Sequence, residues 1–309
     1  MTVIVRDLRP EVEADAEAFA RVRRLALPYL LFTADSVRHV LSHSHPDARF
    51  RSLVAEEDGE VIGTAQVALA HESREPGQGY LNIYVHPERT GRGAGRLLVR
   101  AAEEHLAGCG ATRLYAWILD EPRNRAFAER HGYLRRRSAR LLRLDLAGGT
   151  LPPLEEPPPG VELRTGADFA DDPRPLFELD AEAASDEPGD VGVDFSDFEA
   201  WIEHYWKHPL LDRELTVAAV VEGRPVAFSV AYTDGTGSYA TAMTGTARAH
   251  RGRGLAKLAK NHSLHRARAA GCTEAFTGND AGNEPMMAIN RWFGYEICAT
   301  ETRYVRELG

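Results

Sequence analysis

The turn HRGRGLA, residues 250–256, follows a short strand pattern at 242–246 and precedes a long helical pattern. A strand that stops at a glycine-rich turn and restarts as a helix leaves the first N–H groups of the helix pointing at one spot. The helix dipole adds partial positive charge there, so such a turn suits a phosphate or pyrophosphate group. Glycine matters because a side chain would keep the ligand away from the backbone.

The same arrangement occurs earlier in the chain, where the strand pattern LNIYV (81–85) runs into TGRGAG (90–95). The surrounding landmarks also recur in one order. They are an opening strand that ends in Arg (3–6 and 161–164), a hairpin (52–63 and 217–227), a Gly-Cys pair with a following strand (108–118 and 271–277), and a short helix that closes on Gly-Tyr (132–133 and 294–295). Asp58-Gly59 and Glu222-Gly223 supply the hairpin turns. We interpret the chain as a duplicated α/β unit.

A proline-rich segment, 148–160, divides the chain near its midpoint. It has no hydrophobic period, and its prolines favour extended structure without N–H donors. We therefore predict an N-terminal domain at 1–147, a semi-rigid linker at 148–160 and a C-terminal domain at 161–309.

The composition excludes several classes of protein. The formal net charge of −9 argues against nucleic-acid binding, which relies on clustered Lys and Arg. No stretch approaches the roughly 18 apolar residues of a membrane span, and Arg6 and Asp7 interrupt any secretory signal, so we expect a cytoplasmic protein. Three scattered cysteines, Cys109, Cys272 and Cys298, are too few for a disulfide framework or a zinc site, and we expect no metal.

Neither glycine-rich turn matches the GxxxxGK[ST] phosphate loop or the GxGxxG dinucleotide fingerprint. Residues 250–256 instead resemble the [RQ]-x-x-G-x-[GA] signature of the GCN5-related N-acetyltransferases, the GNAT superfamily. The first-half turn keeps the glycines but has Thr90 at the position of Arg251. The resemblance covers essentially the whole chain as a tandem pair, similar to the tandem acetyltransferases of actinobacteria.

This resemblance implies two tandem α/β (α+β) domains, each with a mixed, mostly antiparallel sheet flanked by helices. The fourth and fifth strands of each sheet would splay apart to hold acetyl-coenzyme A. Backbone N–H groups near 244–246 or 83–85 would polarise the thioester carbonyl, as preorganised donors do. The expected coenzyme-binding residues are Thr246, Arg251, Gly252, Arg253, Gly254, Leu255, Ala256, Asn279 and Asn283, with Val85, Thr90, Gly91, Arg92, Gly93, Ala94 and Gly95 in the first half.

The pattern offers several candidates for the catalytic residues. Asn283 matches the family pattern, but Asn290 occupies the position of the usual acid, a Tyr, and the first half has Glu121 and Ala128 at the two positions. We expect direct attack by an amine, with the second half catalytic because it keeps the fuller pattern. The candidates are Thr244, Tyr239 and Asn290, with Tyr84, Asp120 and Glu121 at comparable places in the first half. The alternatives are aromatic wall residues for the tyrosines and helix caps for the two acids.

The segment 168–203 carries thirteen Asp or Glu residues against one Arg. Clustered carboxylates would concentrate a cationic amine, although a solvated acidic surface is an equal interpretation. Its aromatic residues favour a core, with one or two available to line an acceptor pocket. They are Phe195, Phe198, Trp201, Tyr205 and Trp206.

The favoured hypothesis is an acetyl-CoA-dependent N-acetyltransferase acting on a small-molecule amine, as a monomer or homodimer. One alternative is a pair of domains that binds coenzyme A without catalysis. Another is a nucleotide-binding regulator that uses the same turns. A narrower option is mycothiol synthase, with a cysteinyl-glucosaminyl-inositol acceptor.

Overall fold

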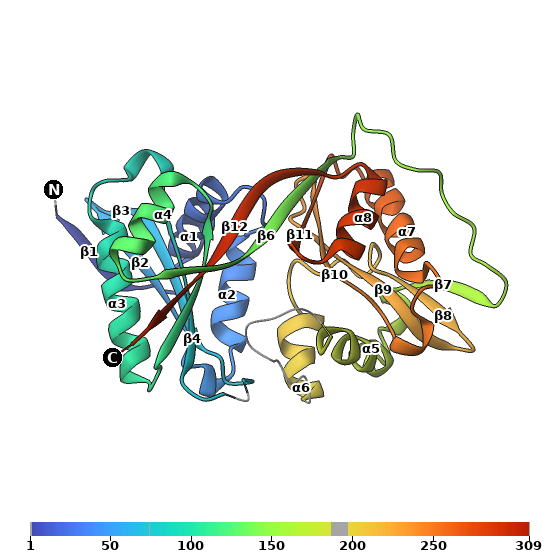
Figure 1. Ribbon diagram of the computed structural model, residues 1–309, viewed down its shortest axis with the longest axis horizontal. Helices are drawn as coiled ribbons and strands as arrows, with labels where there is room; N and C mark the ends of the chain where they lie inside the picture. Colours follow the sequence, from blue (N-terminus) through green and yellow to red (C-terminus); the bar gives the residue numbers. More distant parts are fainter. Residues whose placement is uncertain (1, 74, 187–196, 309) are drawn as a thin grey trace. The chain divides into compact units, whose positions relative to one another are not determined.

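The computed structural model describes residues 2–73, 75–186 and 197–308, with its elements labelled in Figure 1. The chain forms two compact units. Unit 1 comprises Met1–Ala139 together with Ala299–Gly309, and unit 2 comprises Arg140–Cys298. Each unit is an α/β layer structure, as the duplicated pattern predicts.

Unit 1 has a mixed sheet in the order β1-β2-β3-β4-β5-β12-β6. The parallel pair is β4 with β5, whereas β1/β2, β2/β3, β3/β4 and β5/β12 are antiparallel. Its strands are β1 (Val3–Asp7), β2 (Arg51–Glu57), β3 (Glu60–Leu69), β4 (Gln78–Val85), β5 (Arg113–Leu119), and the unit 1 portions of β6 (Leu134–Asp145) and β12 (Glu296–Glu307). Its helices are α1 (Glu13–Ala26), α2 (Ala34–His43), α3 (Ala94–Gly108) and α4 (Pro122–Arg130), with 3₁₀ turns η1 (Pro46–Ala48) and η2 (Pro87–Arg89).

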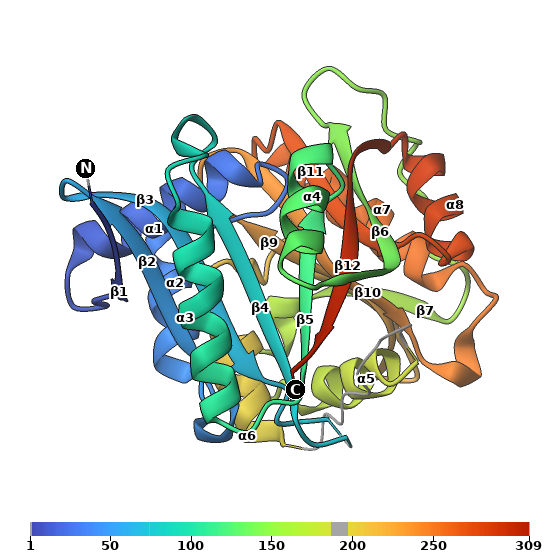
Figure 2. The same ribbon diagram turned by 60° about the vertical axis from the view of Figure 1, so that its left-hand side comes forward.

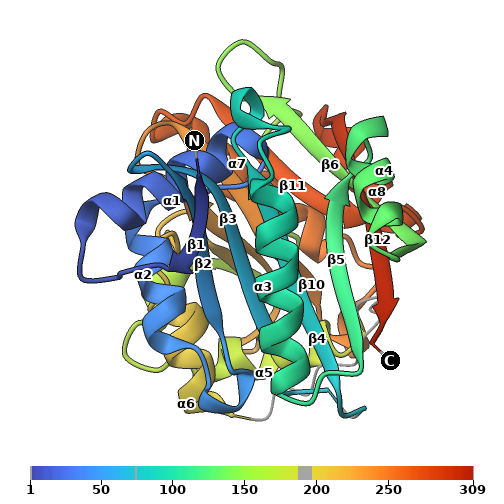
Figure 3. The same cartoon turned by 90° about the vertical axis from the view of Figure 1, so that its left-hand side faces the viewer.

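Helices cover both faces of the unit 1 sheet. Side chains alternate between the two faces along each strand, so consecutive apolar residues pack against helices on opposite sides. On β2, Leu53 packs with Leu98 of α3, whereas the next residue, Val54, packs with Phe19 of α1. Figure 3 shows α3 lying along one face of these strands. The glycine-rich turn connects the end of β4, through η2, to the start of α3.

Unit 2 repeats the arrangement, with the order β6-β11-β10-β9-β8-β7. The strands are β7 (Val161–Thr165), β8 (Val217–Val221), β9 (Arg224–Thr233), β10 (Ser238–Thr246) and β11 (Glu274–Asp280). The helices are α5 (Arg174–Ala184), α6 (Phe198–Trp201), the π-helix η4 (Ile202–Trp206), α7 (Leu255–Ala269) and α8 (Glu284–Phe293), with 3₁₀ turns η3 (Gly166–Phe169) and η5 (Arg248–His250). Ala219 of β8 packs with Leu258 of α7, and its neighbour Ala218 packs with Phe177 of α5.

The compact units divide the chain differently from the domains 1–147 and 161–309 that the sequence suggests. The boundaries fall within β6 and β12, because each of these strands has residues in both units. From Glu301 to Glu307, β12 pairs with β5 of unit 1, so the C-terminal strand completes the N-terminal sheet. Conversely, the second part of β6 lies beside β11, with Arg143 paired to Glu274. The two halves of the sequence therefore exchange strands.

The segment 148–160, expected as a semi-rigid linker, is fastened to unit 2 by hydrogen bonds. It belongs to unit 2 and lies along α7. Asn261 accepts a hydrogen bond from the backbone N–H of Glu155 (3.0 Å) and donates one to the carbonyl of Pro153 (3.1 Å), while Lys257 pairs with the Glu155 carboxylate (2.9 Å). Proline has a carbonyl acceptor but no N–H donor, so a proline-rich segment suits a position where side chains of α7 donate hydrogen bonds to its carbonyls.

Candidate functional site

Each sheet opens at one place between two parallel strands. In unit 2, β10 and β11 pair only over Ser238–Ala240 and Glu274–Phe276, and they separate beyond that point. In unit 1, β4 and β5 pair only over Gln78–Tyr80 and Arg113–Tyr115. Figure 2 shows the divergence of β4 and β5 beyond their first residues. Both separations lie beside a glycine-rich turn, which brings the predicted phosphate site and an opening between strands together.

A β-bulge distinguishes the two openings. The register between β10 and β9 shifts between Thr241 and Met243, so Ala242 has no partner on β9. The equivalent β4–β3 ladder runs without a shift from Gly79 to Val85. A bulge leaves an extra residue outside the ladder and redirects its neighbours, which frees main-chain groups beside the opening in unit 2.

The two turns have matching backbones. Gly91 and Gly93 have φ of 81° and 91°, and Gly252 and Gly254 have 74° and 75°. An added Cβ at any of these glycines would meet no atom within 4 Å. Glycine is therefore required here by the left-handed backbone and not by neighbouring protein atoms, and the space beside each turn stays open for a ligand.

A cavity of about 560 Å³ occupies the opening of unit 2, within the usual size range for small-molecule sites. Of the predicted residues, Thr244, Thr246, Arg251, Ala256, Asn279 and Asn283 line it. Gly252, Arg253 and Gly254 belong to the adjacent turn, and the Leu255 side chain is buried in the core under α7. Leu255 can therefore contribute its backbone N–H alone.

A cavity of about 540 Å³ occupies the opening of unit 1. The predicted residues that line it are Val85, Thr90, Gly91, Gly93, Ala94 and Gly95. Arg92 does not line it, because its guanidinium pairs with the nearly buried Glu57 at 2.6 Å. The wall includes the Phe127 ring of α4, which would lie 3.2 Å from a Cβ placed on Gly95. Both halves thus keep a cleft beside the turn.

The sequence matches the acetyltransferase (GNAT) family at residues 16–133 and 176–295, which includes both clefts. The chain belongs to this family. The tandem GNAT fold expected from the sequence is confirmed. Members of the GNAT family generally use acetyl-CoA.

Known proteins resemble this GNAT chain over different lengths. A mycothiol acetyltransferase of Nocardia farcinica is 41% identical over 138 residues, which is 44% of this chain and 43% of that protein. The chain thus spans less than half the length of that relative. A mycothiol acetyltransferase of Clavibacter michiganensis is 30% identical over 267 residues, 83% of each protein. A tandem GNAT protein from the clavulanic acid biosynthesis pathway is 19% identical, with a TM-score of 0.75 over 100% of this chain and 99% of that one.

Arg251, the arginine of the GNAT signature, lies on the cavity wall of unit 2 with its charge already paired. Its guanidinium contacts Asp186 at 2.5 Å and donates to the carbonyl of Thr246 at 3.2 Å. Arg248 also pairs with Asp186, at 2.7 Å. Arg248 and Arg251 together hold the pKa of the Asp186 carboxyl well below its usual range. The sequence does not reveal that an acid of the 168–203 segment neutralises these arginines.

Thr244 fits a ligand-facing role. It lines the cavity, and its hydroxyl oxygen is buried without a hydrogen-bond partner in the described part of the chain. A buried hydroxyl without a partner costs free energy, so a ligand atom that bonds to it gains affinity. Tyr239 lies elsewhere: it is fully buried, and its hydroxyl contacts the Ser263 hydroxyl at 2.7 Å inside the core. Tyr239 therefore does not reach the cavity.

Asn290 is fully buried behind the cavity wall and not in it. Its amide donates to the side-chain oxygen of Asn279 at 2.5 Å and accepts from the Lys260 ammonium at 2.6 Å. Asn283 lines the cavity, and its side chain also caps α8 by accepting from the N–H of Met286 at 3.3 Å. The position of the usual GNAT tyrosine thus holds a structural amide, which hydrogen-bonds to Asn279 on the cavity wall.

The first-half candidates separate in the same way. Glu121 lines the unit 1 cavity, whereas Asp120 pairs with Arg125 (2.8 Å) and Arg135 (3.1 Å). Neither acid caps α4 with its side chain. Tyr84 lines the cavity beneath the buried guanidinium of Arg23, which lies 4.8 Å from its ring centroid. Burial raises the pKa of Tyr84 above its ordinary value, which favours the wall interpretation over an acid.

The acidic segment is mostly engaged within unit 2. Besides Asp186, the Asp168 and Asp197 carboxylates accept from backbone N–H groups near the starts of η3 and α6. Asp180 accepts from the Trp201 indole N–H at 2.8 Å, and burial raises its pKa. Phe198, Trp201, Tyr205 and Trp206 belong to a hydrophobic cluster under α5, and Phe195 lies outside the described residues. These contacts favour structural roles for the segment.

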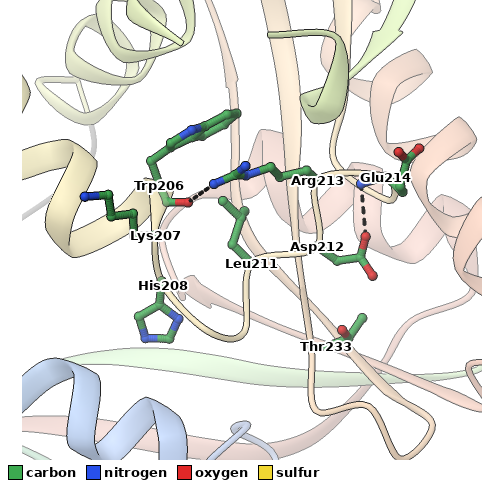
Figure 4. A pocket seen from close by; sticks show the side chains of 8 residues that line it. All are labelled: Trp206, Lys207, His208, Leu211, Asp212, Arg213, Glu214 and Thr233. Carbon is green, nitrogen blue, oxygen red and sulfur yellow. Dashed lines mark hydrogen bonds between the residues drawn. The ribbon is translucent and has the colours of Figure 1, made fainter. Parts of the chain in front are cut away.

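A third hollow, of about 330 Å³, lies at the surface of unit 2 beside Trp206, Arg213 and His208 (Figure 4). Its polar groups bond to the protein itself: Arg213 donates to the Trp206 carbonyl at 3.0 Å, and Asp212 accepts from two backbone N–H groups. Across residues 2–73, 75–186 and 197–308, no cluster of three metal-ligating side chains occurs, and no helix is long and apolar enough to cross a membrane.

Sequence reasoning missed the bulge and the residues beside it. Thr241 and Met243 line the unit 2 cavity on either side of Ala242. The spacing of equivalent glycines in the two halves indicates the bulge. Gly237 follows Gly77 by 160 positions, whereas Gly252 follows Gly91 by 161. One residue is therefore inserted between these landmarks in the second half, and the structure accounts for it as the bulge.

Proposed function

We propose that this chain is an acetyl-CoA-dependent N-acetyltransferase that acetylates the amine of a small molecule, with the chemistry in unit 2. The bulge at Ala242 carries the proposal. It lies where β10 and β11 separate, so main-chain N–H groups there are free to donate to a thioester carbonyl. Preorganised donors of this kind lower the barrier to acyl transfer by about 3–4 kcal/mol.

The residues of unit 2 fit acetyl-CoA. The turn at 252–254 offers backbone N–H groups for the pyrophosphate, and Arg251 adds a guanidinium at the cavity wall. The Thr244 hydroxyl and the Asn279 amide line the path between the separated strands, where the pantetheine arm would lie. The thioester supplies the activated acetyl group. The chain's residues orient it, and an amine attacks directly without a nucleophilic side chain.

Proton transfer does not use a tyrosine at the usual position, because Asn290 occupies it. The attacking amine must lose a proton, and the departing thiolate gains one. Thr244 has a buried hydroxyl two residues from Ala242, and we assign it the role of hydrogen-bonding the reacting groups. This assignment requires no ionised side chain in the cleft.

The first acceptor to test is the amine of the mycothiol precursor, a cysteinyl-glucosaminyl-inositol. The relatives from Nocardia and Clavibacter are named mycothiol acetyltransferases, which supports this choice. A panel of small primary amines covers the broader proposal. Binding of acetyl-CoA with no thiol release for any amine would favour the alternative of a non-catalytic coenzyme-binding pair.

A matched pair of charge changes tests which unit acts. Arg251→Glu and Thr90→Glu each place a carboxylate at the equivalent position of one turn, where it repels a pyrophosphate. We expect Arg251→Glu to lower kcat/KM for acetyl-CoA about 100-fold, and Thr90→Glu to lower it less than threefold. Thiol release measured with a chromogenic disulfide gives both values. The reverse order would move catalysis to unit 1.

Deletion of Ala242 tests the bulge directly. It restores the uninterrupted register seen in unit 1, because Thr241 and Met243 already pair with consecutive residues of β9. We expect kcat to fall about 100-fold, as it does when one oxyanion donor is removed, while coenzyme A binding changes little. Calorimetry of coenzyme A and steady-state kinetics separate these effects. An unchanged kcat would remove the bulge from the mechanism.

A further inference from the structure

A lysine lies fully buried inside unit 2, and no carboxylate among the described residues pairs with it. Lys260 of α7 has no exposed surface, and its ammonium donates to the Asn290 side-chain oxygen at 2.6 Å. The ring centroid of Tyr295 lies 4.8 Å from the ammonium. Lysine is rarely buried without a carboxylate, because desolvating the charge is costly. A lysine at this buried position therefore points to a role that an apolar residue could not fill.

The lysine determines the orientation of two amides. A protonated lysine has donors and no acceptor, so Asn290 must present its carbonyl oxygen to Lys260. The Asn290 amide nitrogen then faces Asn279 and donates to its oxygen at 2.5 Å. The side-chain nitrogen of Asn279 donates to no protein acceptor among the described residues. Asn279 lines the unit 2 cavity, so this nitrogen is available to a ligand there.

We propose that Lys260 is a positioning residue that, through Asn290, fixes the side-chain amide of Asn279 as a hydrogen-bond donor to the acyl-pantetheine arm in the unit 2 cleft. The inference rests on the proposed function, because it takes acetyl-CoA as the occupant. The arm offers amide and thioester carbonyl oxygens, which accept from an N–H and are repelled by a carbonyl. A flipped Asn279 would present its oxygen to the arm.

This arrangement explains why Asn290 need not be tyrosine. A tyrosine would face the cleft itself, whereas Asn290 is held behind the wall between Lys260 and Asn279. All three side chains come from different elements, α7, α8 and β11, and they meet where β11 leaves the parallel pairing. The donor therefore lies at the opening between the strands.

The Asn290→Asp variant tests the orientation. A carboxylate at this position accepts from Lys260 and from Asn279 at once, so Asn279 must turn its nitrogen inward and its oxygen toward the cleft. Every protein in the experiment also carries Thr90→Glu, so that coenzyme A binding reports on unit 2. Calorimetry measures the dissociation constants of coenzyme A and of 3′-phospho-ADP, which lacks the pantetheine arm.

We expect Asn290→Asp to weaken coenzyme A binding at least tenfold and to change 3′-phospho-ADP binding less than twofold. Lys260→Met, which frees both amides to flip, should also weaken coenzyme A binding selectively, and Lys260→Arg, which has donors and no acceptor, should recover most of the loss. The control Asn261→Asp places a carboxylate at a buried position of the same helix whose partners are in the 148–160 segment, and it should leave the ratio of the two constants unchanged.

Equal loss of affinity for both ligands would mean general damage to the fold and would overturn the inference, as would an unchanged coenzyme A constant in Asn290→Asp. Failure of the proposed function is a separate result: the unmodified protein would bind coenzyme A and release no thiol with any amine. Absence of coenzyme A binding by the Thr90→Glu protein would overturn both.

Discussion

Tyr304→Ala is expected to destabilise unit 1 by about 3–5 kcal/mol, although Tyr304 belongs to the last strand of the chain. Its side chain is fully buried in a cluster with Leu81, Leu106 and Leu114. Removal of the ring leaves a cavity beneath α3 and β5, because β12 supplies the strand next to β5. The reciprocal change, Leu142→Ala in β6, should cost unit 2 about 2–5 kcal/mol, because Leu142 is buried with Leu264 and Phe293.

Hydrogen exchange measured by mass spectrometry assigns each loss to a unit. Tyr304→Ala should lower the protection of α3 amides and leave α7 amides unchanged, whereas Leu142→Ala should do the opposite. Glu307→Ala is the control on the same strand, because its exposed pair with Arg113 contributes little. Loss of protection in α7 on replacement of Tyr304 would contradict the strand exchange.

Local patterns predicted the parts of the fold that depend on local backbone chemistry. Asp58-Gly59 and Glu222-Gly223 adopt the positive φ angles of tight hairpin turns, and Gly294 ends α8 in the left-handed conformation. The glycines of both phosphate turns behave in the same way. Each of these features follows from a few adjacent residues, so a sequence contains enough information to identify it.

The strand exchange has no such local signature. Both β6 and β12 follow a Gly-Tyr pair and mix apolar with charged residues, so neither sequence carries a local mark of the sheet that it joins. Which sheet receives which strand is a property of tertiary packing. The sequence repeat therefore suggests domain boundaries at 147 and 161, whereas the compact units divide within the two strands.

The residues of the candidate site also divide into those that local sequence identifies and those that tertiary packing places. Residues that act through the backbone of the turns are identifiable from the sequence. Asn290 is a candidate because it occupies the position of the usual GNAT tyrosine, and Tyr239 because it lies on the expected fourth strand. Tyr239 points into the core instead, and Asn290 is covered by Lys260. A lysine in a long helix normally suggests an exposed face. That expectation fails for α7, because α8 packs against Lys260 and the 148–160 segment covers a further part of the helix.

The effect of Lys260→Met on the free energy of unfolding should change sign between pH 6 and pH 10. Burial lowers the pKa of Lys260 to about 7, against an ordinary value of 10.5 when unfolded. Between these values the unfolded state binds more protons, so the free energy of unfolding of the natural protein rises with pH from 7 to about 10.5. Below pH 7 the full desolvation cost is present, and it corresponds to roughly 5 kcal/mol. The surrounding phenols of Tyr295 and Tyr239 have pKa values raised by burial and add no charge near neutrality.

Methionine removes this cost but leaves the Asn290 oxygen without a donor, a penalty of about 1–3 kcal/mol at every pH. The variant should therefore be more stable than the natural protein at pH 6 by about 2–4 kcal/mol, and less stable by up to about 2 kcal/mol near pH 10, where roughly 1 kcal/mol of the desolvation cost remains. Urea unfolding followed by tryptophan fluorescence reports mainly on unit 2, which holds Trp201, Trp206 and Trp292. Lys257→Met, one turn earlier on the surface of α7, should show no such crossing. A constant difference between pH 6 and 10 would mean that Lys260 stays charged in the core, and the rigid orientation of Asn290 would then extend over the whole range.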